Sequence, residues 1–157
     1  MIWKTFDGQP VRGNLPRIIE DAIVRETKVG YKVKVCVGTD SRVKMSRINF
    51  ASVVVVLREK NGGYMFFNRS SMHRNGLAMK ERLIIEVGKS VQIAFELNDV
   101  LMKYDVPLEV HADINQDEAY LSYTALKEAL GYIKGMGFDF KLKPDAFASS
   151  SCADRLV

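Results

Sequence analysis

The spacing of hydrophobic and polar positions predicts strands in the first half of the chain. Residues 31–42 (YKVKVCVGTDSR) alternate lysine with valine and then reach Gly38 and Asp40, and residues 48–59 (INFASVVVVLRE) form a second β-type run. Asn61-Gly62-Gly63 is a hairpin turn signal, followed by a third run at 63–72 (GYMFFNRSSM). Three runs with short connections predict an antiparallel meander.

The period changes to 3.6 residues further along, which predicts helices. Residues 77–104 carry one apolar stripe, made of Leu83, Val87, Ala94, Leu97 and Leu101. An earlier helix is expected at 12–27, with Asn14 as N-cap and Pro16 in its first turn. The remaining expected elements are a strand at 107–115 (PLEVHADIN), a helix at 118–135 ended by Gly135 or Gly137, a strand at 138–144 and the start of a final helix at 146–157.

This order predicts an α/β fold. After the N-terminal helix it is β-β-β-α-β-α-β-α, which implies a five-stranded mixed sheet flanked by helices. The first and fourth strands can lie side by side in parallel, linked by a right-handed crossover. We expect one domain over residues 1–157, with residues 1–30 as an N-terminal helical extension, because this length suits a single core and contains no linker or repeat.

Composition and charge narrow the class of protein. No stretch approaches the roughly 20 apolar residues that span a bilayer, and the start MIWKTFDGQP does not resemble a signal peptide, so a cytoplasmic location is expected. The net charge of +4 and pI of about 9.1 favour a polyanionic partner. Two cysteines, Cys36 and Cys152, make neither a disulfide framework nor a zinc site, and Cys36 is expected as a small buried hydrophobe.

Two aspartates follow apolar strands. Asp40 comes after VCVGT and Asp113 after VHA. Acids at the carboxyl ends of adjacent parallel strands meet at the sheet edge where α/β proteins bind ligands. Each alone could equally be a helix cap or a turn former.

Glu86 is the third candidate acid. On a helical wheel it lies about 60° from Leu83, at the margin of the buried stripe, whereas Glu81 lies about 160° away. The length of helix needed to run back beside the following strand also brings Glu86 near the level of Asp113. The alternatives are a surface glutamate that interacts with Lys89 or Ser90, and Glu81 in place of Glu86.

Asp154 is the fourth candidate. If one of the serines 149–151 caps the last helix, Asp154 falls in its first turn, where a negative charge is favoured in any case. Asp145 in KPDAF is the competitor, although Pro144-Asp145 suggests a turn. Clustered carboxylates repel one another, and two Mg²⁺ or Mn²⁺ ions about 4 Å apart would both relieve this repulsion and support phosphodiester cleavage.

Four short motifs together carry a family resemblance. VGTDS, a glutamate on the first core helix, HADIN and CADRL resemble the four acidic motifs of ribonuclease H, and the topology matches over residues 31–157. More narrowly, ERLIIEVGKS, HADIN and the tail from GYIKG to the last residue resemble the uncharacterised YkuK-like family of ribonuclease H-like proteins.

The resemblance implies a metal-dependent nuclease acting on RNA, RNA–DNA hybrid or structured DNA. Asp40, Glu86, Asp113 and Asp154 would be both its catalytic residues and its metal ligands. The alternative is a non-catalytic nucleic-acid-binding module that retains the fold. A sugar-kinase or actin-type ATPase is disfavoured because such proteins need two such domains.

Four further residues are assigned to the same region. We expect Ser41, Lys143 and Arg155 to contact the substrate, although Lys143 and Arg155 could instead balance the charge of the acids. His111 alternates with Asp113 on one strand, so it could orient a carboxylate through a hydrogen bond or could be a core histidine with its partners satisfied. The oligomeric state is left open.

Overall fold

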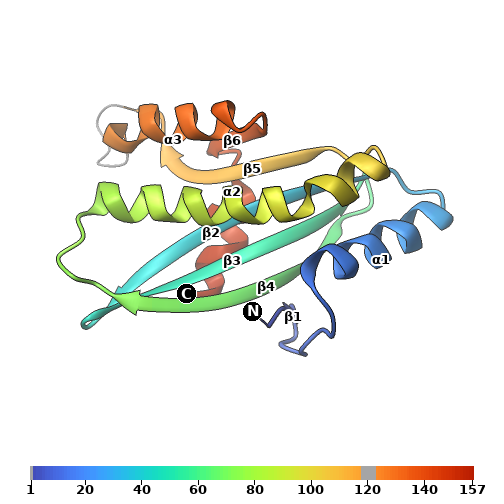
Figure 1. The fold of residues 1–157 in the computed structure, drawn as a ribbon, viewed down its shortest axis with the longest axis horizontal. Coiled ribbons are helices and arrows are strands. Elements are labelled where there is room, and N and C mark those ends of the chain that lie inside the picture. Colours follow the sequence, from blue (N-terminus) through green and yellow to red (C-terminus); the bar gives the residue numbers. More distant parts are fainter. Residues whose placement is uncertain (1, 118–122) are drawn as a thin grey trace.

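A computed structural model describes residues 2–117 and 123–157 and contains one six-stranded sheet in the order β1-β4-β3-β2-β5-β6 (Figure 1). The strands are β1 (Lys4–Thr5), β2 (Val33–Lys44), β3 (Arg47–Arg58), β4 (Gly63–His73), β5 (Leu108–Asn115) and β6 (Asp139–Lys143). The helices are α1 (Leu15–Lys28), α2 (Met79–Lys103) and α3 (Tyr123–Gly135), followed by a π-helical turn, η1 (Ala148–Ala153), and a 3-10 turn, η2 (Asp154–Leu156).

The predicted mixed sheet is confirmed, with one strand more than expected. β2, β3 and β4 form the antiparallel meander, and β5 pairs in parallel with both β2 and β6. The additional strand, β1, pairs with the outer edge of β4 through Lys4 and Thr5. The sequence did not predict β1, because a strand of two residues is too short to show an alternation of polar and apolar positions. The buried Trp3 and the side chain of Asn68, which donates to the backbone carbonyl of Ile2 at 2.7 Å, hold the segment there.

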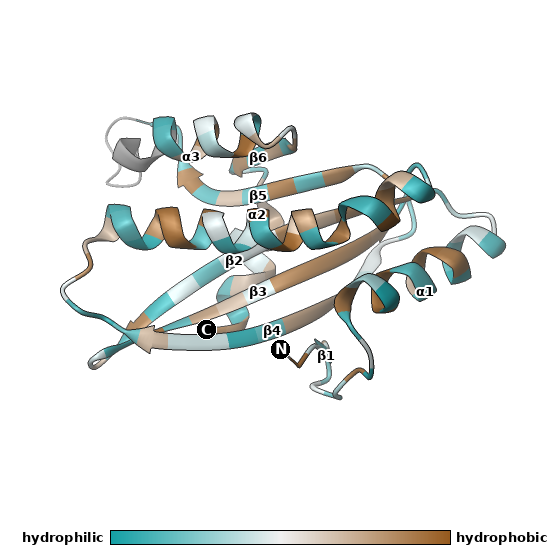
Figure 2. Cartoon of the chain, viewed as in Figure 1, coloured by the Kyte–Doolittle hydropathy of each residue, from teal (hydrophilic) through white to brown (hydrophobic). Residues whose placement is uncertain are grey.

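Three helices cover one face of the sheet, while η1 lies against the other (Figure 1). The side chain of Asn14 accepts from the backbone N–H of Arg17, which confirms the predicted N-cap of α1. The predicted stripe of α2 is buried in full. Figure 2 shows the brown, apolar parts of β3 on the side where α1 crosses the sheet and more polar segments toward the β2–β3 hairpin.

The end of the chain differs from the predicted final helix. The hydroxyls of Ser149 and Ser150 both donate to the carbonyl of Ala146 instead of capping a helix, and both serines lie within η1, which η2 follows. The backbone of η1 packs so closely on β2 that a Cβ at Gly38 would lie 2.5 Å from the nitrogen of Ser149. The helix expected at 118–135 is present from Tyr123, and the start of that expected range lies outside the described residues.

Candidate functional site

Asp40 and Asp113 lie where two parallel strands separate. The last paired residues of β2 and β5 are Gly38 and His111, and each aspartate is two positions further along its strand. Beyond this point β5 curves away from β2 (Figure 1). A register shift between Ala112 and Asn115 in the pairing with β6 places Asp113 in a bulge, a feature that turns a side chain out of the regular alternation.

Glu86 approaches the same region from α2. Its side chain is buried, 3% exposed, and accepts a 2.5 Å hydrogen bond from the hydroxyl of Ser41, while the guanidinium of Arg82 lies 3.8 Å away. Burial raises the pKa of Glu86 to about 8; the Ser41 bond opposes this rise, and the charge of Asp40 adds to it. Burial of Glu86 therefore disfavours its ionised form in the metal-free protein.

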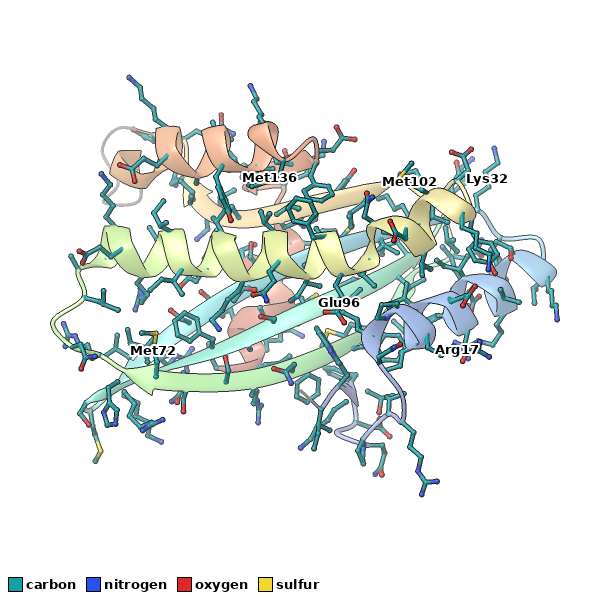
Figure 3. The ribbon with its side chains drawn as sticks, viewed as in Figure 1. Arg17, Lys32, Met72, Glu96, Met102 and Met136 are labelled. Carbon is teal, nitrogen blue, oxygen red and sulfur yellow. The ribbon has the colours of Figure 1, made fainter. Side chains whose placement is uncertain are left out.

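Two other glutamates on α2, Glu81 and Glu96, are exposed. Glu81 is exposed and accepts from the backbone N–H of Ala78 at 2.6 Å, so it caps the start of the helix. Glu96 is exposed, and Figure 3 shows its side chain beside α2. Glu86 therefore lies on the inner margin of the helix, where the helical wheel placed it.

Asp40 also carries a perturbed carboxyl group. Burial raises the pKa of Asp40 to about 6, the backbone N–H of Ser41 opposes the rise, and the charges of Asp113 and Asp154 add to it. The charges of Asp40 and Asp113 in turn raise the pKa of Glu86. Acids from β2, β5, α2 and η2 thus share one electrostatic environment.

Asp154 reaches this environment from the opposite face to α2. It is about half exposed in η2 and lies 3.4 Å from the guanidinium of Arg42. Asp145, the competitor, is exposed in a turn in which its backbone N–H donates to the carbonyl of Leu142. The placement of Asp154 depends on the close approach of η1 to Gly38, which the sequence motif did not reveal.

The residues expected to bind substrate divide into three cases. Ser41 is buried, and its hydroxyl donates a hydrogen bond to Glu86. In this structure Ser41 is therefore a partner of the Glu86 carboxylate. Lys143 lies 3.0 Å from Oδ1 of Asp113, which is the charge-balancing alternative. Arg155 is exposed in η2.

His111 is buried, and its hydrogen-bonding capacity is used. Its Nδ1 accepts from the backbone N–H of Ala148 at 3.1 Å, so the ring proton lies on Nε2, which is 3.2 Å from a carboxylate oxygen of Glu109. Burial lowers the pKa of His111. The ring therefore ties β5 to η1, which carries Asp154 at its end, instead of touching one of the four acids.

A second group of potential metal ligands lies on the sheet face that η1 covers. Within the described residues, one group of three metal-ligating atoms falls within 4.8 Å of one another, and it belongs to Cys36, Glu109 and His111. Burial raises the pKa of the Cys36 thiol to about 12, and Lys34 lies 3.0 Å from Glu109. This group is a neutralised hydrogen-bonded cluster, and Cys36 is the buried residue that the sequence predicted.

The four acids supply the type of oxygen donor that a hard divalent cation prefers. Oδ1 of Asp113 is covered by protein, and its sole partner among the described residues is the ion pair with Lys143, with no well-directed hydrogen bond. Carboxylate oxygens of this kind are the donors that Mg²⁺ and Mn²⁺ prefer. Among the described residues no three of the four acids bring oxygens within 4.8 Å of each other, so this donor set is more open than the Cys36 cluster.

Comparison with known proteins gives a family match, a similar sequence and a similar structure. A family model described as "Ribonuclease H-like" matches residues 16–157. The uncharacterized protein YkuK of Bacillus subtilis (strain 168) is 26% identical over 134 residues, which is 77% of each chain. The N-terminal ribonuclease H domain of a Mycobacterium tuberculosis protein, solved as a fusion with maltose-binding protein, aligns with 80% of this chain and 91% of its own at 16% identity and a TM-score of 0.36. No helix among the described residues has the length and apolar character needed to cross a membrane.

Proposed function

Because the chain belongs to the ribonuclease H-like family, we propose that it is a metal-dependent nuclease that hydrolyses phosphodiester bonds in RNA, RNA–DNA hybrid or structured DNA. The observation that carries this proposal is the set of acids at the parting of β2 and β5, where burial and mutual repulsion raise the pKa values of Asp40 and Glu86. Such a charge cluster is costly without cations.

Asp40, Glu86, Asp113 and Asp154 are the proposed ligands of two Mg²⁺ or Mn²⁺ ions. Ions of this kind, when bound, activate a water molecule and stabilise the leaving oxygen of a phosphodiester. Ser41 orients the carboxylate of Glu86 through its hydroxyl. Lys143 and Arg42 pair with Asp113 and Asp154, and if cations took over these carboxylates the two side chains would be free to contact phosphate groups.

The proposal is tested first by Mn²⁺ binding. Calorimetry on the wild-type protein, Asp113→Asn and Asp145→Asn should show binding that Asp113→Asn abolishes and Asp145→Asn leaves unchanged. Asp145 is the matched control because it is an exposed acid in the turn after β6. Each protein is then incubated with labelled RNA, RNA–DNA hybrid and DNA in Mg²⁺ or Mn²⁺. Wild type and Asp145→Asn should cleave at least one of these substrates, whereas Asp113→Asn should cleave none.

A non-catalytic nucleic-acid-binding module is the second candidate. The ion pairs Lys143–Asp113 and Arg42–Asp154 favour it, because they neutralise two of the acids with side chains of the protein itself. Nucleic-acid binding that is unchanged by EDTA and by Asp113→Asn, together with no cleavage of any substrate, would select this candidate.

A further inference from the structure

The sheet face opposite α1 and α2 carries polar rows beyond the acids. Residues paired across antiparallel strands project to the same side, so the register of β2, β3 and β4 defines these rows. Gly38 belongs to the row under η1, and the next rows run toward the β2–β3 hairpin. They are Asp40–Ala51–Arg69, Arg42–Asn49–Ser71 and Lys44–Arg47–His73, which together we call the outer platform.

The outer platform is basic, and its four cations are open to solvent, whereas Ala51 is buried beneath the C-terminal segment. Arg42, Lys44, Arg47 and Arg69 are all exposed. Of these four cations, Arg42 alone has a carboxylate partner among the residues that the structure describes, and this partner is Asp154. Arg47 donates to the hydroxyl of Ser71 at 2.7 Å, which confirms that the two residues share a face.

The outer platform includes one of the acids, Asp40. Asp40 and Arg69 stand in the same row with Ala51 between them, so their Cα atoms are about 10 Å apart at two strand spacings. A groove of about 550 Å³ runs beside the platform and is lined by backbone and side chains of Asn49, Phe50, Arg69, Ser70, Ser71, Leu156 and Val157. Two of the residues that line it, Leu156 and Val157, follow Asp154 closely in the chain.

We propose that the outer platform binds the sugar–phosphate backbone of a single polynucleotide strand and leads it to the acids. The inference rests on the proposed function for the chemistry at those acids. Arginine guanidinium groups pair with phosphate oxygens in a fork geometry, and the hydroxyl and amide groups of Ser71 and Asn49 add neutral hydrogen bonds.

Binding is measured separately from cleavage. Fluorescence anisotropy with a short fluorescein-labelled RNA strand, in EDTA and over a series of NaCl concentrations, compares wild type, the double variant Arg47→Gln/Arg69→Gln and Lys28→Gln. Lys28 is an exposed lysine at the end of α1, away from the platform. Each arginine–phosphate pair that the double variant removes should weaken binding about tenfold, and the salt slope should fall by about 1.4 for the two together, while Lys28→Gln matches wild type.

Three results would refute the proposal that the outer platform binds a polynucleotide strand. They are an affinity and salt slope of the double variant equal to wild type, no binding of RNA by wild type at low salt, and equally tight binding of poly-glutamate. The proposed function fails in a different way. If wild type binds RNA through Arg47 and Arg69 but cleaves nothing with Mg²⁺ or Mn²⁺, the platform proposal is supported and the nuclease proposal is refuted. If wild type cleaves a substrate and the double variant cleaves it equally well, the nuclease proposal is supported and the platform proposal is refuted.

Discussion

Replacing Glu86 with glutamine should stabilise the metal-free protein, and the gain should grow with pH. Glu86 is buried at the site, and its pKa is raised from 4.5 to about 8. A carboxyl group with a raised pKa in the folded state contributes stability that is fully present below pH 4.5 and is lost as the pH rises to about 8. Glutamine removes this loss, because it stays neutral and its oxygen can still accept from Ser41.

The magnitude follows from proton linkage. With pKa values of 4.5 unfolded and about 8 folded, ionisation linked to Glu86 lowers the free energy of unfolding by about 3 kcal/mol at pH 7 and by less than about 1 kcal/mol at pH 5. Urea denaturation of both proteins in EDTA at pH 5, 7 and 8 measures the difference. Glu96→Gln, an exposed position on the same helix, is the control and should change little at any pH.

The expected signature is a gap between Glu86→Gln and wild type that widens by about 2 kcal/mol or more from pH 5 to pH 7. A gap that stays constant with pH would refute the reasoning, because it would mean that Glu86 is ionised at ordinary pH in the folded protein. Adding Mn²⁺ should stabilise wild type more than Glu86→Gln, since the cation binds the ionised carboxylate of the folded state.

Two other predictions concern how η1 is held. Gly38→Ala places a Cβ 2.5 Å from the nitrogen of Ser149 and 2.6 Å from the carbonyl carbon of Ala148. Urea denaturation should therefore show a free energy of unfolding lower by about 1–3 kcal/mol, and Mn²⁺ calorimetry should show weaker binding because Asp154 moves. Wild-type values in both measurements would contradict the close approach of η1 to β2. His111→Leu leaves the buried N–H of Ala148 without its acceptor and should cost about 1–3 kcal/mol at neutral pH. Because burial lowers the pKa of His111, wild type should lose stability as the pH falls below 6.5, and the variant should lack that component, which denaturation at pH 5 and 7 can measure.

The local pattern of the sequence was sufficient for most of the fold. A period of two identified the meander strands, and the stripe of α2 from Leu83 to Leu101 is buried as expected. The same stripe located Glu86 on the inner margin, because a helix links side-chain direction directly to sequence spacing. Strand β1 was not predicted, because two residues are too few to show a period. Its pairing depends on Phe66 and Phe67, which are distant from it in sequence.

The site was only partly contained in the local pattern. Asp40 and Asp113 could be placed at adjacent strand ends, but the bulge at Asp113 and the engagement of Ser41 with Glu86 arise from contacts between elements far apart in the chain. The turn that carries Asp154 replaced the expected helix because Gly38 lets the backbone of η1 pack directly on β2.

Sequence by itself therefore determined most of the elements, their order and which residues carry acidic chemistry, since these follow from interactions over a few residues. Tertiary structure decided which of those acids share one electrostatic environment and which cations lie beside them. It also decided that Arg47 and Arg69 lie on one face with Asp40, because strand register couples residues that no local spacing connects.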